Sequence, residues 1–203
     1  MILGKWNRSV ILTYIGLAFA VCGIFLAITT TRIDLSYSCL MVAGICDLFD
    51  GAVARKVKRN DEEKAFGIEL DSLVDSIDFI ALPIAIFIQS GLVSPVYIAL
   101  YILYAICGIA RLAHFNAVTA DGNGPVKFYT GLPVTYTALI FPLFYLLSLV
   151  IPENIFPVIY ALVILGVSAL EVLKVKVIKP KGAAYIFFGL LAIVMLIVYL
   201  VFL

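Results

Sequence analysis

Eight residues at fixed spacing between positions 47 and 75 carry the clearest chemical signal in this sequence. They form the pattern D-x2-D-G-x2-A-R-x11-G-x3-D-x3-D and are, in order, Asp47, Asp50, Gly51, Ala54, Arg55, Gly67, Asp71 and Asp75. If both segments are helical, residues three or four positions apart lie on one face, so each aspartate pair presents its carboxylates together. Asp78 extends the second pair by almost one turn.

Four carboxylates in an apolar chain need a compensating charge or water. A charged side chain at the centre of a bilayer costs roughly 2.5–3.5 kcal/mol on insertion scales. Hard divalent cations prefer oxygen ligands, and a pair of them stabilises both the attacking and the leaving oxygen of a phosphoryl transfer. The pattern therefore predicts a metal-dependent phosphoryl-transfer site. The alternative is a solvated charge run or a set of buried ion pairs with Arg55.

The pattern resembles the signature of the CDP-alcohol phosphotransferase family, integral membrane enzymes that join an alcohol to a phosphatidyl or related group and release CMP. By this resemblance, Asp47, Asp50, Asp71 and Asp75 would bind two divalent cations, Mg²⁺ or Mn²⁺. Asp75 would also be the catalytic general base, and the hydroxyl of the acceptor would attack the β-phosphoryl group of a CDP-linked lipid.

Small residues beside the aspartates would let a nucleotide approach the backbone closely. We expect Gly51, Ala54 and Gly67 to contact the CDP-lipid and Arg55 to bind its diphosphate. Helix packing is the alternative for the three small residues, because such residues are enriched where membrane helices touch. Thr13 is a weaker candidate for the same pocket, and an ordinary helix residue is the simpler interpretation.

The connection between Arg55 and Gly67 is longer than the family pattern. Eleven residues separate them, three more than the family usually has. The surplus falls in the polar run from Lys56 to Lys64, which we interpret as a turn outside the hydrocarbon. A longer turn there should leave both helical faces intact.

Composition predicts an all-α integral membrane protein. Of the 203 residues, 64% are apolar. Each apolar stretch is near the roughly 20 residues that a helix needs to cross a bilayer. The stretches cover about 9–29, 35–55, 67–90, 95–117, 132–150, 154–173 and 182–203. We therefore expect a bundle of six to seven transmembrane helices, forming a single membrane domain over residues 1–203.

Charge predicts the orientation in the membrane and excludes some partners. A net charge of +1 argues against a nucleic-acid-binding protein. With the N-terminus inside, thirteen of the fourteen basic residues lie on one side, and Arg32 is alone on the other. By the positive-inside rule, the aspartate motif then faces the cytoplasm from the cell membrane. Cysteines show no CxxC or His/Cys grouping, so zinc and redox chemistry have no support.

A second, weaker resemblance concerns the acceptor alcohol. The segments RLAHFN, at 111–116, and GLP, at 131–133, look like those of bacterial and archaeal phosphatidylserine synthases. This likeness implies CDP-diacylglycerol and serine as substrates, although His114 replaces a second arginine of that pattern. The candidate acceptor-binding residues are Asp78, Arg111, His114, Asn116, Thr130 and Gly131.

Each of these residues also has a simpler interpretation. Arg111 suits the carboxylate of an amino acid, but an arginine at a helix end also reaches for lipid headgroups. His114 is equally well read as an interfacial histidine, and Asn116 as a helix cap. Glu171 is expected to pair with one of the lysines between Lys174 and Lys181.

Other acceptors and another class of protein remain open. The same chemistry would serve glycerol phosphate, inositol phosphate, inositol or choline. Phosphorylated acceptors need several convergent cations, and the apolar segments offer only Arg55 and Arg111, which favours an unphosphorylated acceptor. A small transporter using the acidic stripe as a cation pathway is the alternative of a different class, although no symmetry between halves is visible. A homodimer fits the family resemblance, but the sequence identifies no interface.

Overall fold

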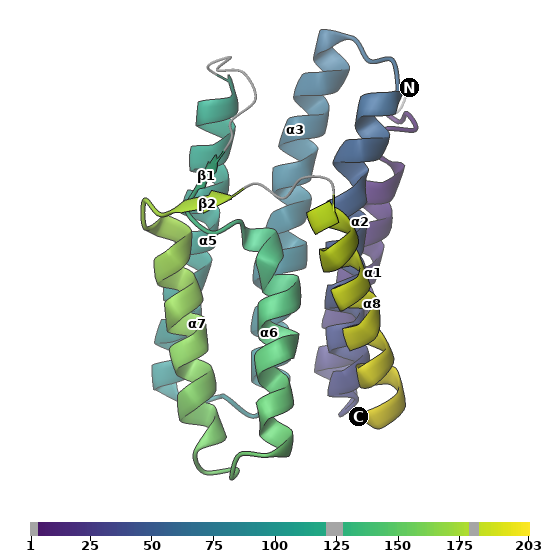
Figure 1. The fold of residues 1–203 in the computed structure, drawn as a ribbon. Helices are drawn as coiled ribbons and strands as arrows, with labels where there is room; N and C mark the ends of the chain where they lie inside the picture. Colours follow the sequence, from purple (N-terminus) through teal and green to yellow (C-terminus); the bar gives the residue numbers. More distant parts are fainter. Residues whose placement is uncertain (1–3, 121–127, 179–182) are drawn as a thin grey trace.

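The computed structural model describes residues 4–120, 128–178 and 183–203, and most of them are helical (Figure 1). The N-terminal part contains α1 (Ile11–Thr29), α2 (Ile33–Lys56), α3 (Asp61–Ser76), the π-helix η1 (Ile77–Ala81) and α4 (Leu82–Gln89). The C-terminal part contains α5 (Pro95–Ala120), β1 (Phe128–Thr130), the 3₁₀-helix η2 (Val134–Tyr136), α6 (Thr137–Tyr145), the 3₁₀-helix η3 (Leu146–Leu149), α7 (Phe156–Val172), β2 (Lys176–Ile178) and α8 (Ala183–Phe202). The prediction of an all-α membrane protein is confirmed. The short antiparallel ribbon of β1 and β2 is an addition to it.

Among the described residues, three helical segments are long and apolar enough to cross a bilayer: α1, α2 and Pro95–Val118 of α5. Shorter apolar segments cover Val134–Leu149, Phe156–Val172 and Ile186–Phe202. The stretch predicted at 67–90 is divided among α3, η1 and α4, which follow one another without a break. Large apolar side chains are exposed along these helices, as at Val96 and Phe202. Such a surface suits contact with lipid better than contact with water.

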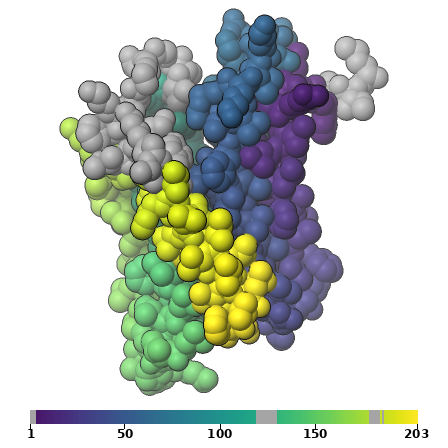
Figure 2. Space-filling view, turned by 45° about the vertical axis from the view of Figure 1, so that its right-hand side comes forward, coloured from purple at the N-terminus to yellow at the C-terminus, as the bar shows by residue number. Residues whose placement is uncertain are grey.

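The two ends of the bundle differ in the elements they carry. The N-terminus and the α2–α3 turn lie at one end, and the C-terminus and the α6–α7 connection lie at the other (Figure 1). Figure 2 shows α8 crossing the front of the molecule between α6 and the α1–α2 pair. Lys127, Lys179 and Lys181, which entered the prediction of orientation, lie outside the described residues.

Pro83 accounts for the π-helix between α3 and α4. A proline has no N–H to donate to the carbonyl four residues earlier, which is that of Phe79. Tyr104 of α5 donates its hydroxyl hydrogen to this carbonyl instead. The single π-turn absorbs the displaced backbone. Backbone polar groups in a bilayer need hydrogen-bond partners within the protein. The bond from Tyr104 provides this partner, and α3, η1 and α4 continue as one helical segment.

Buried tyrosines hold together the half of the bundle farther from the α2–α3 turn. The hydroxyls of Tyr37 and Tyr160 lie 2.5 Å apart and share a hydrogen bond. Tyr160 also donates to the carbonyl of Phe141 at 3.1 Å, and Tyr199 donates to that of Pro142 at 2.7 Å. These bonds satisfy carbonyls around the proline inside α6. The other half of the bundle is left for polar chemistry.

A close approach of α2 and α6 occurs at Gly44, one turn before Asp47. A methyl group on Gly44 would lie 2.5 Å from the β-carbon of Ala138. Side chains do not tolerate so short a contact, so only glycine allows the two helices to approach this closely.

Gly44→Ala is therefore expected to destabilise the protein by about 1–3 kcal/mol, as other overpacking substitutions do. Thermal unfolding in detergent measures the change as a lower Tm. Gly166→Ala in α7 is the matched control, because a methyl group there meets nothing within 4 Å. Equal Tm values for the two variants would contradict the close approach.

Candidate active site

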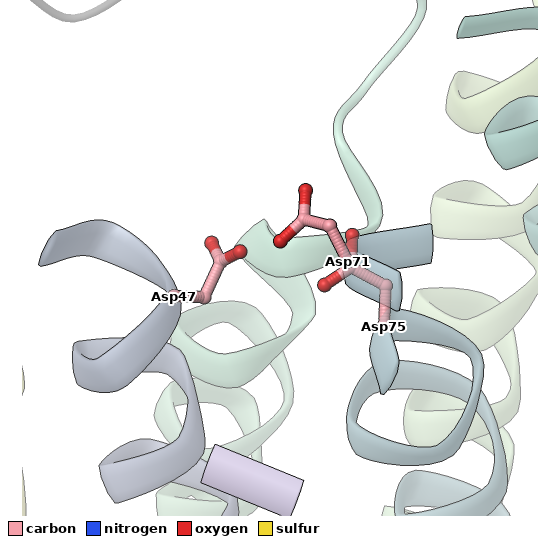
Figure 3. A group of neighbouring side chains, drawn as sticks. All are labelled: Asp47, Asp71 and Asp75. Carbon is pink, nitrogen blue, oxygen red and sulfur yellow. The ribbon is translucent and has the colours of Figure 1, made fainter. Parts of the chain in front are cut away.

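Three carboxylates from two helices converge in the polar half of the bundle. Asp47 comes from α2, and Asp71 and Asp75 come from successive turns of α3. One carboxylate oxygen of each lies within 4.8 Å of those of the other two (Figure 3). None of the ion pairs formed between described residues involves these aspartates, so the alternative of ion pairs with Arg55 is not observed there. An all-oxygen donor set of this kind fits a hard divalent cation.

Asp50 extends this cluster toward α1. Its carboxylate is 8% exposed and accepts a hydrogen bond of 2.9 Å from the hydroxyl of Thr13. On its other side Asp50 lies next to Asp71 of α3. Asp71 thus has carboxylate neighbours on both sides, and the four side chains form one connected group. Their role as metal ligands stays a prediction.

A cavity of about 210 Å³ lies beside Asp50 and Asp71, between α1, α2 and α3. Its lining includes the four residues predicted to contact the nucleotide, Gly51, Ala54, Arg55 and Gly67, together with Thr13 and Arg59.

The two glycines of this cavity face guanidinium groups rather than other helices. A methyl group on Gly51 would lie 3.5 Å from Nη1 of Arg55, and one on Gly67 would lie 3.3 Å from Nη1 of Arg59. No backbone of a neighbouring helix lies within 4 Å of either methyl position among the described residues. This favours ligand contact over helix packing at these two positions.

The polar connection after α2 is shorter than the sequence suggested. α2 ends at Lys56 and α3 begins at Asp61, so only residues 57–60 form the turn. Asn60 caps α3: its side chain accepts from the amide of Glu63 at 2.8 Å, and the Glu63 carboxylate accepts from the amide of Asn60 at 2.9 Å. Lys5 also pairs with Glu62 at 2.8 Å. The turn is therefore held by a helix cap and an ion pair at the edge of the cavity.

On the acceptor side, Asn116 joins α5 to α3. Its side-chain oxygen accepts a hydrogen bond of 2.9 Å from Ser72, the neighbour of Asp71. The interpretation of Asn116 as a helix cap was wrong, because α5 continues to Ala120. Arg111 is 6% exposed, and its guanidinium lies 5.5 Å from the ring centre of Phe115. Arg111 is therefore buried in the bundle rather than extended toward headgroups.

The remaining acceptor candidates lie in three different surroundings. His114 is exposed, although Arg111 on the same helix is buried. Asp78 is 2% exposed and lies against Gly16 of α1 and Cys46 of α2. Asp78 thus extends the aspartate group toward α1 and α2. Contact of either side chain with the acceptor stays a prediction.

Gly131 and Thr130 belong to a backbone turn against α7. Thr130 pairs with Lys176 in the β1–β2 ribbon, and Gly131 has a φ of 78°. The amide of Gly131 donates to the carbonyl of Val175 at 2.8 Å. A side chain on Gly131 would collide with the backbone of Glu171. Glycine is needed here for its positive φ and for this close contact.

Comparison with known proteins identifies the family. The family model for CDP-alcohol phosphatidyltransferases matches residues 6–172. The chain belongs to the CDP-alcohol phosphatidyltransferase family. The matched residues include the four aspartates, the residues that line the cavity and the candidate acceptor-binding residues.

Among similar curated proteins, the archaetidylserine synthase of Methanothermobacter thermautotrophicus is 37% identical over 134 residues, which are 65% of this chain and 55% of that protein. The CDP-diacylglycerol–serine O-phosphatidyltransferase of Mycobacterium tuberculosis is 32% identical over 139 residues, 64% of this chain and 48% of that protein. The protein of the same name from Saccharomyces cerevisiae is 35% identical over 103 residues, 48% of this chain and 36% of that protein. The chain thus spans about half the length of the first two relatives.

Two residues lie in surroundings that the sequence analysis did not predict. Arg59 lines the cavity although it lies in the connection interpreted as a plain turn. Glu171 forms no ion pair with Lys174 or Lys176, which are exposed, and it faces α5 instead. Lys179 and Lys181, the other lysines considered as its partners, lie outside the described residues. The sequence could not predict the position of Arg59, because residues in a turn follow no periodic pattern. For Glu171, the available signal was a lone acidic residue inside an apolar segment.

Arg59→Ala is expected to weaken binding of CMP about tenfold or more, because a hydrogen bond to a charged group contributes roughly 1.5–3 kcal/mol. Titration of the purified protein with CMP and with cytidine measures the effect on each ligand. Cytidine should lose less affinity than CMP, since it has no phosphate. Lys58→Ala, an exposed cation one residue away, is the control. Equal affinities of the two variants for CMP would contradict a role for Arg59.

Proposed function

We propose that this chain transfers a phosphatidyl group from CDP-diacylglycerol to the hydroxyl of serine, giving phosphatidylserine and CMP, with two divalent cations, Mg²⁺ or Mn²⁺. The main support is that Asp71 belongs both to the carboxylate cluster and to the lining of the cavity with two guanidinium groups. A site for cations and a pocket for an anionic nucleotide therefore share one wall.

Different residues of the cavity bind different parts of the nucleotide. Arg55 and Arg59 supply two planar donors that suit phosphate oxygens. Gly51, Ala54 and Gly67 leave the space in which ribose and base fit against the backbone. The hydrogen bond from Thr13 fixes the carboxylate of Asp50 at the inner end of this pocket.

Asp75 is the general base in this proposal. It is 9% exposed and lies within 4.8 Å of the ligand oxygens of Asp47 and Asp71, close to where a phosphoryl group would meet cations. Asp75 takes the proton of the acceptor hydroxyl, whose oxygen bonds to the β-phosphorus as the bond to CMP breaks. The cations, when bound at these aspartates, reduce the charge on the transferring phosphoryl group.

Serine as acceptor is supported by the names of the relatives and by the position of Arg111. All three relatives described above carry serine in their names. Arg111 is a buried cation on the helix that also carries Asn116, and Asn116 contacts α3 next to Asp71. A guanidinium there suits the carboxylate of an amino acid.

We further propose that the site faces the cytoplasm from the cell membrane. The basic residues of the α2–α3 turn lie at the end that holds the N-terminus, and Arg32 follows α1 at the opposite end (Figure 1). The positive-inside rule assigns the basic end to the cytoplasm. Cytidine nucleotide would then enter from the compartment in which it is made.

An acceptor panel tests the proposed reaction. Purified protein with CDP-diacylglycerol and Mg²⁺ or Mn²⁺ is incubated with serine, glycerol phosphate, inositol phosphate, inositol or choline, and CMP and lipid products are quantified. We expect equal amounts of CMP and phosphatidylserine with serine. Another lipid product would keep the chemistry and replace the acceptor, whereas absence of CMP with every acceptor would favour the cation-pathway alternative.

Asp71→Asn is expected to lower the rate of CMP release about a hundredfold or more. Loss of a residue that merely supports a metal ligand already costs ten- to a hundredfold, and Asp71 is next to all three other aspartates. Rates are measured across a range of Mg²⁺ and Mn²⁺ concentrations. Glu69→Gln, an exposed acid on the same helix, should behave like the unmodified protein. Full activity of Asp71→Asn at limiting metal would refute the proposed cation site.

A further inference from the structure

Glu171 is a buried carboxylate for which the proposed reaction has so far no role. It lies in the last turn of α7 and is 1% exposed. Neither of its carboxylate oxygens has a hydrogen-bond partner within the described part of the chain. A buried carboxylate without a donor is costly, so an ionisable group at this depth indicates a functional site with a cationic partner.

The surroundings of Glu171 are on α5, at the level of Arg111. Its Oε2 atom would lie 3.7 Å from a methyl group on Gly108, and Tyr104 and Cys107 of the same helix are also neighbours. Arg111 follows Gly108 by one turn and lies within electrostatic range of Glu171. The Glu171 carboxyl group and the Arg111 guanidinium group therefore occupy the same part of the α5–α7 interface.

The backbone turn at 131–133 holds Glu171 in place. The amide of Leu132 donates to the carbonyl of Leu170 at 2.8 Å. Gly131 packs directly on the backbone of Glu171, where a side chain would collide. The GLP segment, first noted for its likeness to serine-using enzymes, thus touches the one acidic residue of α7. Its contribution to an acceptor site would be to position this carboxylate.

We propose that Glu171 binds the ammonium group of the acceptor amino acid, while Arg111 binds the carboxylate; this rests on serine as the proposed acceptor. An amino acid carries both charges on one carbon atom, so a cation and an anion must face the same small volume to recognise it. The pair selects zwitterions: a hydroxy acid lacks the ammonium group, ethanolamine and choline lack the carboxylate, and glycerol phosphate lacks the ammonium group.

The first test uses the unmodified protein with serine and two analogues. 3-Hydroxypropanoate is serine without the amino group, and ethanolamine is serine without the carboxylate. We expect kcat/KM for CMP release to be about ten- to a hundredfold higher with serine than with either analogue, the effect of one charge-assisted hydrogen bond. Equal values for serine and 3-hydroxypropanoate would overturn the assignment of Glu171.

The second test is Glu171→Gln, which keeps the shape of the side chain and removes its charge. The KM for serine should rise about ten- to a hundredfold, while the KM for CDP-diacylglycerol and the rate with 3-hydroxypropanoate stay unchanged. Glu153→Gln, an exposed glutamate before α7, is the control.

Equal losses with serine and 3-hydroxypropanoate would show that Glu171 only holds Arg111 or the helices in place, which overturns the proposal. Binding of CMP by the Glu171→Gln protein checks that this variant is folded. If the variant is not folded, the comparison of serine with its two analogues on the unmodified protein decides whether Glu171 binds the ammonium group. Failure of the serine reaction can be told apart from failure of the role of Glu171. Absence of phosphatidylserine refutes the serine reaction. If the acceptor that the protein does use has no ammonium group, the role of Glu171 is overturned, and if that acceptor is another amino alcohol, the role is supported.

Discussion

Mutual repulsion of carboxylates inside an apolar bundle is the constraint on which the rest of this structure depends. Asp47, Asp71 and Asp75 place oxygens within 4.8 Å of one another, and Asp50 adjoins them. In a medium of low dielectric constant such charges repel strongly and lose their hydration. A packed scaffold holds the carboxylates together, and divalent cations bound as proposed above would offset their repulsion. In that proposal the stability of the site depends on how well it binds those ions.

The fold supplies that scaffold by separating a rigid half from a reactive half. Tyr37, Tyr160 and Tyr199 bond to one another or to carbonyls near the end of the bundle that holds the C-terminus. Tyr104 bonds to the carbonyl that Pro83 leaves without a donor, which keeps α3 continuous with α4. Because the bonds of Tyr37, Tyr160 and Tyr199 lie away from the aspartates, they hold the helices in position without occupying the cavity beside Asp50 and Asp71.

Within the polar half, α3 lies between the two binding regions proposed above. The cavity between α1, α2 and α3 is lined by small residues and two arginines, which suit a nucleotide diphosphate. On its other face α3 contacts α5 through Ser72 and Asn116, and α5 in turn carries Arg111 opposite Glu171 of α7. Family members that differ in acceptor could retain the first side and vary the second.

The sequence alone determined the apolar helices and the pairing of aspartates within each helix, because both follow from local periodicity: a helix repeats every 3.6 residues whatever surrounds it. Only the tertiary structure decided which residues from distant segments meet. Arg59 reaches Gly67 through a capped turn, Asn116 bonds to Ser72, and Glu171 lies near Arg111 while Lys174 and Lys176 are exposed. These contacts depend on how α3, α5 and α7 pack and on the φ of Gly131, and no spacing along the chain encodes such distances.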